Sequence, residues 1–130
     1  MWITNSKGEI LLARRALTKS NDPGKWGPAV AGTVEVGESY RKNIIKEAEE
    51  ELGSKNIKPV KLIKKRIFGK HNFFCQMYLL KIDRQIKDFK IQKKEVEEIK
   101  WFSKKELEQK IKSKPETFTA SMKMWIKLMC

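Results

Sequence analysis

The segment 39–53 constrains the fold most, because it carries two opposite patterns on what we predict to be one helix. Apolar side chains recur at helical spacing at Ile44, Ile45, Ala48 and Leu52. This spacing predicts an amphipathic helix from about Ser39 to Leu52 that covers a hydrophobic core. Gly53 follows directly and is suited to the position that ends a helix in a left-handed conformation.

The other face of this helix is acidic. Glu47, Glu50 and Glu51 have the spacing i, i+3 and i+4, which places them together on one side. Like charges this close repel, and a hard divalent cation that prefers carboxylate oxygens relieves the repulsion. We interpret this face as a site for Mg²⁺, with Mn²⁺ as a second candidate, that holds a diphosphate. A Glu-rich face with no ligand at all is the plainer interpretation of the cluster taken alone.

The surrounding residues favour the metal site. The stretch GTVEVGESYRKNIIKEAEEELGS at 32–54 resembles the Nudix box. Six positions match at the family's spacing: Gly32, Glu38, Glu47, Glu50, Glu51 and Gly53. The resemblance implies an α/β/α sandwich and a Mg²⁺-dependent hydrolase. The substrate would be a nucleoside diphosphate derivative or a related organic diphosphate, cut at its diphosphate linkage.

The same resemblance assigns roles to the matching residues. Gly32, Glu47, Glu50 and Glu51 would bind the metal, and Glu47 or Glu50 would act as the catalytic base. Acids outside the box, at Glu95, Glu97 or Glu98, are alternatives for the base. Glu38, Lys46 and Gly53 would support the box. Two positions depart from the pattern: Lys46 replaces an arginine, keeping the charge but losing the bidentate fork, and Ser54 replaces an apolar residue.

Residues 2–39 contain Arg-Arg-Ala-Leu-x-Lys at 14–19, Pro-Gly-x-Trp at 23–26 and Gly-Glu-Ser at 37–39, and residues 116–121 read ETFTAS. Together these segments resemble type I isopentenyl-diphosphate isomerases. The isomerase reaction uses a cysteine in a Cys-Gly-His segment, and this chain has 31–33 as Ala-Gly-Thr. The partner acid falls near residues 72–74, which include no carboxylate, and the tryptophan of that family falls near Glu116. Arg15 and Lys19 match the positions that bind the substrate diphosphate. An isomerase-like protein is therefore a first alternative function.

Length and composition indicate one domain. A chain of 130 residues with 40% hydrophobic composition suits one compact domain over residues 1–130. No apolar run approaches the ~18 residues of a membrane span. The two cysteines give no disulfide framework and no metal-ligand spacing, so we expect a reducing, cytoplasmic setting. The first strand begins at residue 1 with almost no lead-in, so we expect either a truncated N-terminal edge or a domain that is minimal at this edge.

The net charge of +13 raises a second alternative, a non-catalytic domain that binds a nucleotide or RNA. Aromatic and basic residues interleave over residues 64–74, a pattern that suits stacking of single strands. We favour the interpretation of this segment as a half-buried strand with a solvated face, and small-molecule diphosphates rather than nucleic acid as the ligand. A free edge strand would allow a homodimer.

The remaining pattern mixes strands and helices without regular alternation. We predict strands at 1–4, 9–14, 29–32, 58–68, 72–82 and 97–102, with loops at 15–28 and 83–94. A capping box at Ser103–Glu106 starts a second helix that ends near Lys112. Thr119 is expected to cap a last helix that ends near Met129. Such an order favours an α+β fold, with one mixed sheet between helices.

Overall fold

The computed structural model describes residues 1–68 and 72–130, and the connection expected at 69–71 lies outside the described residues. Its strands are β1 (Trp2–Thr4), β2 (Ile10–Arg15), β3 (Trp26–Pro28), β4 (Val60–Ile67), β5 (Phe73–Lys81) and β6 (Val96–Phe102). Its helices are α1 (Tyr40–Leu52), α2 (Lys104–Ser113) and α3 (Ser121–Met129). Short 3₁₀ turns lie at η1 (Ile86–Asp88) and η2 (Pro115–Thr117).

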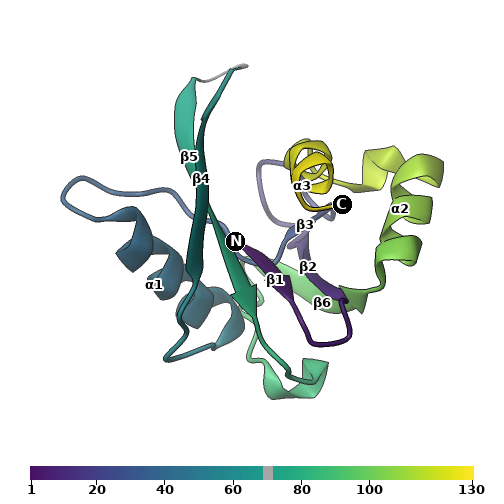
Figure 1. The fold of residues 1–130 in the computed structure, drawn as a ribbon, viewed down its shortest axis with the longest axis horizontal. Helices are drawn as coiled ribbons and strands as arrows, with labels where there is room; N and C mark the ends of the chain where they lie inside the picture. Colours follow the sequence, from purple (N-terminus) through teal and green to yellow (C-terminus); the bar gives the residue numbers. More distant parts are fainter. Residues whose placement is uncertain (69–71) are drawn as a thin grey trace.

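The strands form one mixed sheet that is centred on β2. One edge of β2 pairs along its length with β6, and its other edge pairs first with β1 and then with β3, all antiparallel. Strand β1 also pairs with β5 in parallel, and β5 pairs with β4 antiparallel. Strand β4 therefore ends the sheet, and the β4–β5 hairpin extends well beyond the helices (Figure 1).

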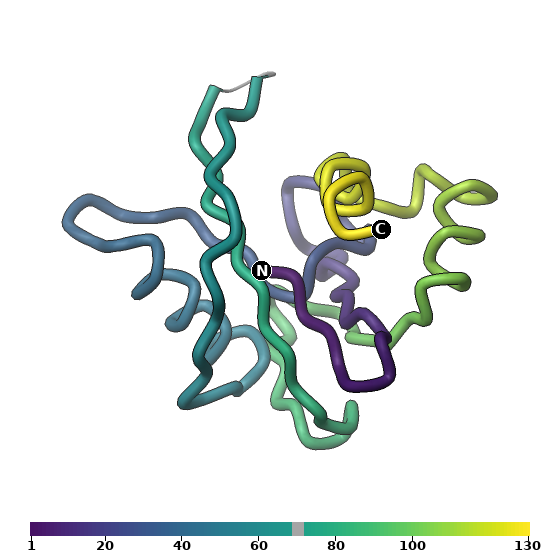
Figure 2. The backbone as a smooth tube through the Cα atoms, in the orientation of Figure 1, coloured from purple at the N-terminus to yellow at the C-terminus, as the bar shows by residue number. Residues whose placement is uncertain are grey.

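Helices cover both faces of this sheet, as Figures 1 and 2 show. The alternation along β2 decides which side chains face which layer. Leu11 and Ala13 join the core under α1, whereas Ile10 and Leu12 join the core under α2 and α3. The predicted α/β/α sandwich with a mixed sheet is confirmed.

Helix α1 begins and ends as its sequence predicts. The Ser39 hydroxyl accepts a hydrogen bond from the Lys42 backbone N–H at 3.1 Å, which caps the first turn. Gly53 takes φ +67° and its N–H bonds to the Glu49 carbonyl at 2.9 Å, which closes the last turn. Ile44, Ala48 and Leu52 are buried against the sheet.

Three local expectations differ from the structure. The expected strand at 29–32 and part of the expected loop at 15–28 are wrong, because the strand is β3, which pairs with β2 through residues 26–28. The expected Thr119 cap is also wrong, since the residue before α3 is Ala120 and no side-chain cap bond forms there. The segment 83–94 is more than a polar connection, because it holds η1 and buries Phe89 against Trp101.

Gly53 gives the first testable prediction. Both Gly53 (φ +67°) and Gly8 (φ +77°) have a positive φ, which strains any other residue. A Cβ added at Gly53 would lie 2.8 Å from Lys90 Cβ, whereas a Cβ added at Gly8 would meet nothing within 4 Å. Gly8→Ala should therefore cost only backbone strain, roughly 1 kcal/mol. Gly53→Ala adds overpacking and should lower the free energy of unfolding by about 2–4 kcal/mol in urea titrations followed by circular dichroism. Equal losses in the two variants would contradict this account of the contact with Lys90.

Candidate functional site

A broad cleft of about 1550 Å³ collects the residues that the sequence singles out. Residues of α1, the 31–34 loop, the 15–22 loop, the end of the β4–β5 hairpin and the start of β6 all contribute to its lining. The predicted metal, catalytic and diphosphate-binding residues all line it: Arg15, Lys19, Gly32, Glu47, Glu50 and Glu51. Segments far apart in the chain are thus brought to one surface.

The loop before α1 approaches the helix very closely at Gly32. A Cβ built on Gly32 would lie 2.4 Å from Glu47 Cγ and 2.9 Å from Asn43 Oδ1. Real side chains do not tolerate such distances, so any residue larger than glycine would push the Glu47 side chain away. The glycine is therefore needed here for close contact between the loop and the Glu47 side chain.

Glu51 is the most perturbed carboxyl group of the site. Burial raises its pKa to about 9, and a hydrogen bond with Glu47 and the negative charges of Glu47 and Glu95 act in the same direction. Glu51 is therefore protonated at neutral pH in the protein alone. Glu50 is exposed at the same cleft.

The structure brings Glu47 and Glu51 together, but over residues 1–68 and 72–130 no group of three or more His, Cys, Asp or Glu side chains has already converged on one point. The chemistry of the donors nevertheless fits a hard divalent cation. A cation would replace the proton shared by this half-buried pair, and carboxylate and carbonyl oxygens are the ligands it prefers. Glu47, Glu50, Glu51 and the Gly32 carbonyl are the residues that would hold it.

Glu38 joins the loop to the helix, as expected. Lys46 Nζ lies 2.7 Å from Glu38 Oε2, so lysine forms the ion pair in place of arginine. Asn43 Nδ2 donates to Glu38 Oε1 at 2.9 Å and to the Thr33 carbonyl at 3.1 Å. The hydrogen bond from Lys46, followed by that from Asn43, holds the pKa of Glu38 below its usual value.

Asn43 is a site residue that the sequence reasoning missed. It is 2% exposed, and its side chain is held between Glu38, Thr33 and the close approach at Gly32. The sequence did offer one sign of this role: Asn43 is a polar residue that lies one helical turn before Glu47 and next to Ile44 on the apolar face. Ser54, the other departure from the box, is buried, and its hydroxyl accepts a bond from Arg84 Nη1 at 3.3 Å.

The two candidate diphosphate ligands have different surroundings. Arg15 Nε donates to the Asn21 carbonyl at 2.8 Å, which holds the loop against the cleft. Lys19 forms an ion pair with Glu95, the one of the three alternative acids that lines the cleft in the described part of the chain. Glu98 instead pairs with Arg14 at 3.0 Å. Glu95 therefore lies at the cleft, whereas Glu97 and Glu98 are not among the described residues that line it.

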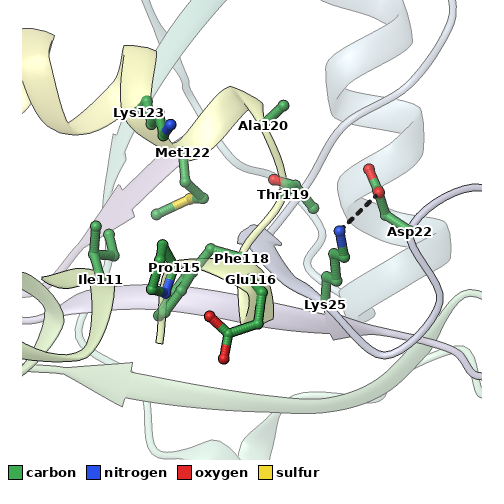
Figure 3. Close-up of a pocket in the computed structure, with 10 residues that line it drawn as sticks. All are labelled: Asp22, Lys25, Ile111, Pro115, Glu116, Phe118, Thr119, Ala120, Met122 and Lys123. Atoms are coloured by element: carbon green, nitrogen blue, oxygen red, sulfur yellow. Dashed lines mark ion pairs between the residues drawn. The ribbon is translucent and has the colours of Figure 1, made fainter. Parts of the chain in front are cut away.

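A smaller pocket of about 330 Å³ lies between the 22–25 loop, η2 and the start of α3 (Figure 3). Figure 3 shows Glu116 there, near Lys25, whose Nζ lies 3.5 Å from Asp22 Oδ1. Glu116, at the position of the isomerase tryptophan, is thus in this pocket and is not among the described residues that line the broad cleft. Cys75 does line the cleft, but burial raises the pKa of its thiol and weakens it as a nucleophile.

Comparison with known proteins identifies the family. The family model described as the NUDIX domain matches residues 1–123. The chain belongs to the Nudix family. An isopentenyl-diphosphate Delta-isomerase of Escherichia coli O1:K1 is 42% identical to this Nudix domain over 52 residues, which are 40% of this chain and 29% of the isomerase. The aligned region therefore spans less than a third of that relative.

Solved structures show the same fold. DR0079 from Deinococcus radiodurans superposes on the Nudix domain with a TM-score of 0.82 at 22% identity, covering 97% of this chain and 77% of the other. The MutT protein from Methanosarcina mazei Go1 gives a TM-score of 0.75 at 24% identity, with coverage of 97% and 86%.

None of the helices in residues 1–68 and 72–130 combines the length and apolar character that crossing a membrane requires.

The Glu38 environment predicts a pH dependence. Because the folded-state pKa is depressed, the charged Glu38 stabilises the fold above its unfolded pKa of about 4.5, and this stabilisation is lost as the pH falls through the folded value. Glu38→Gln should therefore be less stable than the wild type at pH 7, and the difference should shrink towards pH 3. Urea unfolding at pH 7, 5 and 3 measures this difference.

Glu49→Gln provides the matched control. Glu49 is an exposed residue of the same helix, and its nearest cation, Lys55, is 3.9 Å away. Its substitution should change the stability by less than about 0.5 kcal/mol. A Glu38→Gln deficit that stays constant or grows on acidification would contradict the assigned ion pair.

Proposed function

We propose that the chain is a Mg²⁺-dependent pyrophosphohydrolase, with Mn²⁺ as a substitute ion. Its substrate is a nucleoside diphosphate derivative or a related organic diphosphate, a small molecule that is cut at the diphosphate linkage. The observation that carries the proposal is that Glu47, Glu50, Glu51 and Gly32 all line one cleft. Ionised carboxylates at this spacing would repel one another, and a divalent cation could replace the proton by which Glu51 avoids this repulsion.

The residues at the cleft would have distinct roles in this reaction. Glu47, Glu50, Glu51 and the Gly32 carbonyl would hold the cation, which when bound would supply positive charge for the phosphate oxygens and a more acidic water. Glu47 or Glu50 takes the proton of that water as its oxygen bonds to phosphorus and the bond to the leaving phosphate breaks. Glu95, beside Glu51, is the alternative base.

Other residues would position the substrate and the loop. Arg15 and Lys19 bind the non-reacting phosphate oxygens, so Lys19 exchanges its Glu95 partner for the substrate. The ion pair of Glu38 with Lys46 keeps the Gly32 loop on the helix. Gly53 ends the helix after Leu52, so Glu47, Glu50 and Glu51 all lie within its helical turns.

Two rival functions lack these supports. An isomerase of the isopentenyl-diphosphate type needs a thiol where Ala31 stands, and the nearby Cys75 has a raised pKa. A purely binding domain, for a nucleotide or for RNA, has no need for three carboxyl groups at one cleft that can hold a cation. The hydrolase is the function that uses Glu47, Glu50 and Glu51 together.

Glu50 and Glu49 give a paired test of the hydrolase. Wild-type protein should release phosphate or a phosphate ester from at least one member of a panel of nucleoside diphosphate derivatives, with Mg²⁺ and not with EDTA. Glu50→Gln should lower kcat by roughly 100-fold or more, because a cation ligand or general base is lost. Glu49→Gln removes the same charge from an adjacent exposed position and should leave kcat within about twofold.

Two other results with Glu50→Gln and Glu49→Gln would contradict the proposed hydrolase. Turnover that is independent of metal, or equal in the two variants, would contradict the assigned site. Tight binding of panel members without turnover in any of them would leave the binding domain as the function.

Isopentenyl diphosphate tests the isomerase rival. We expect no conversion to its isomer and no exchange of carbon-bound hydrogen in deuterated water, measured by proton NMR, because position 31 has no thiol. Phosphate release from the same compound would still agree with the proposed hydrolase. Isomerisation by the wild type that survives Cys75→Ser would require another proton donor and would contradict the proposal.

A further inference from the structure

The β4–β5 hairpin exposes three large aromatic side chains near its tip. Phe68, Phe73 and Phe74 are 72%, 52% and 58% exposed. The sequence-based interpretation of this segment as a half-buried strand is therefore wrong for its outer end. Figures 1 and 2 show the reason, because the hairpin projects past the helices that would cover it. Phenylalanine is usually buried, and a group of exposed rings marks an interaction surface.

Cations lie over these rings. Arg66 is paired with Phe74 across the two strands, and its guanidinium carbon lies 5.9 Å from the Phe74 ring centroid and 5.1 Å from that of Phe68. Lys64 Nζ lies 5.2 Å from the Phe74 centroid and 5.0 Å from that of Tyr40. Rings and positive charges therefore alternate along one face of the hairpin. We call this group, Tyr40, Lys64, Arg66, Phe68 and Phe74, the hairpin surface.

The hairpin surface continues into the cleft. Tyr40, Phe68 and Phe74 line the same cavity as Glu47 and Gly32. A chain-like ligand on the hairpin can therefore run towards the acidic end of α1. This continuity is a property of the side chains that line the cavity and does not depend on any reaction there.

We propose that the hairpin surface binds single-stranded nucleic acid. Each base has a flat face that stacks on an exposed phenyl ring, and each phosphate carries the charge that Lys64 and Arg66 attract. The net charge of +13 provides a favourable field for such a polyanion. The inference does not rest on the proposed hydrolase, because binding needs neither a metal nor turnover.

The charges argue against a second copy of the chain as the partner. Strand β4 ends the sheet, so its outer edge could pair with another strand. That strand carries exposed Lys61, Lys64, Lys65 and Arg66. Another β4 would bring the same four cations to the pairing and repel them, whereas a phosphate backbone neutralises them.

The experiment measures binding of a fluorescein-labelled 12-nucleotide oligouridylate and of its DNA counterpart by fluorescence anisotropy. The chain of residues 1–130 is used in EDTA, so that hydrolysis and metal binding do not contribute. Phe74→Ala should weaken binding by about tenfold, the value of one stacked base. Arg66→Gln should weaken it and lower the slope of log affinity against log salt by about 1.

Two exposed positions outside the hairpin are matched controls. Lys105→Gln on α2 removes one positive charge, and Ile86→Ala in η1 removes an exposed apolar side chain. Both should bind like the wild type, and thermal melts should show that all four variants fold. This pattern of losses would support the proposal.

Three other results would overturn it. Absence of binding, or equal affinity in all variants, would exclude the hairpin surface as the site. Self-association in analytical ultracentrifugation that Phe74→Ala abolishes, without oligonucleotide binding, would assign the surface to a second copy. Binding only to anionic phospholipid vesicles would assign it to a membrane surface. None of these results bears on the Glu50 test, so failure of one proposal leaves the other standing.

Discussion

The packing of α1 on the sheet is the constraint on which the site depends. Ile44, Ala48 and Leu52 are buried on one side of the helix, and this fixes its rotation about its own axis. Glu47 and Glu50 must then point to the cleft, because successive residues are separated by about 100°. A helix rotated by one position would bury a carboxylate and expose leucine. Apolar burial therefore determines the direction in which the glutamates point.

The sequence was sufficient where the information is local. The helix and its Gly53 end follow from spacings within one segment, and the resemblance to the Nudix box indicated that Glu38 and Lys46 support it. Strand β3 could not be found in this way, since Gly27 and Pro28 are typical of loops and only pairing with β2 makes the segment extended.

The candidate site shows the same division between local and tertiary information. Spacing predicts that the glutamates share a helix face, but the raised pKa of Glu51 results from burial that only the fold creates. The position of Asn43 depends on the loop that folds over it, through the Thr33 carbonyl. The exposure of Phe74 depends on how far the hairpin extends past the helices, and alternation along a strand contains no information on that length.

The parallel pairing of β1 with β5 has a consequence for biosynthesis. Trp2 lies beside Leu79, and Thr4 beside Lys81, so the first strand has no neighbour on that side until β5 has been translated. The hairpin of β1 with β2 can form early, but its apolar residues stay exposed until β5 and the helices cover them. Contacts so distant in sequence slow folding and prolong the exposure of unpaired edges. Until Lys81 has left the ribosome, this edge of β1 is therefore open to pairing with other chains.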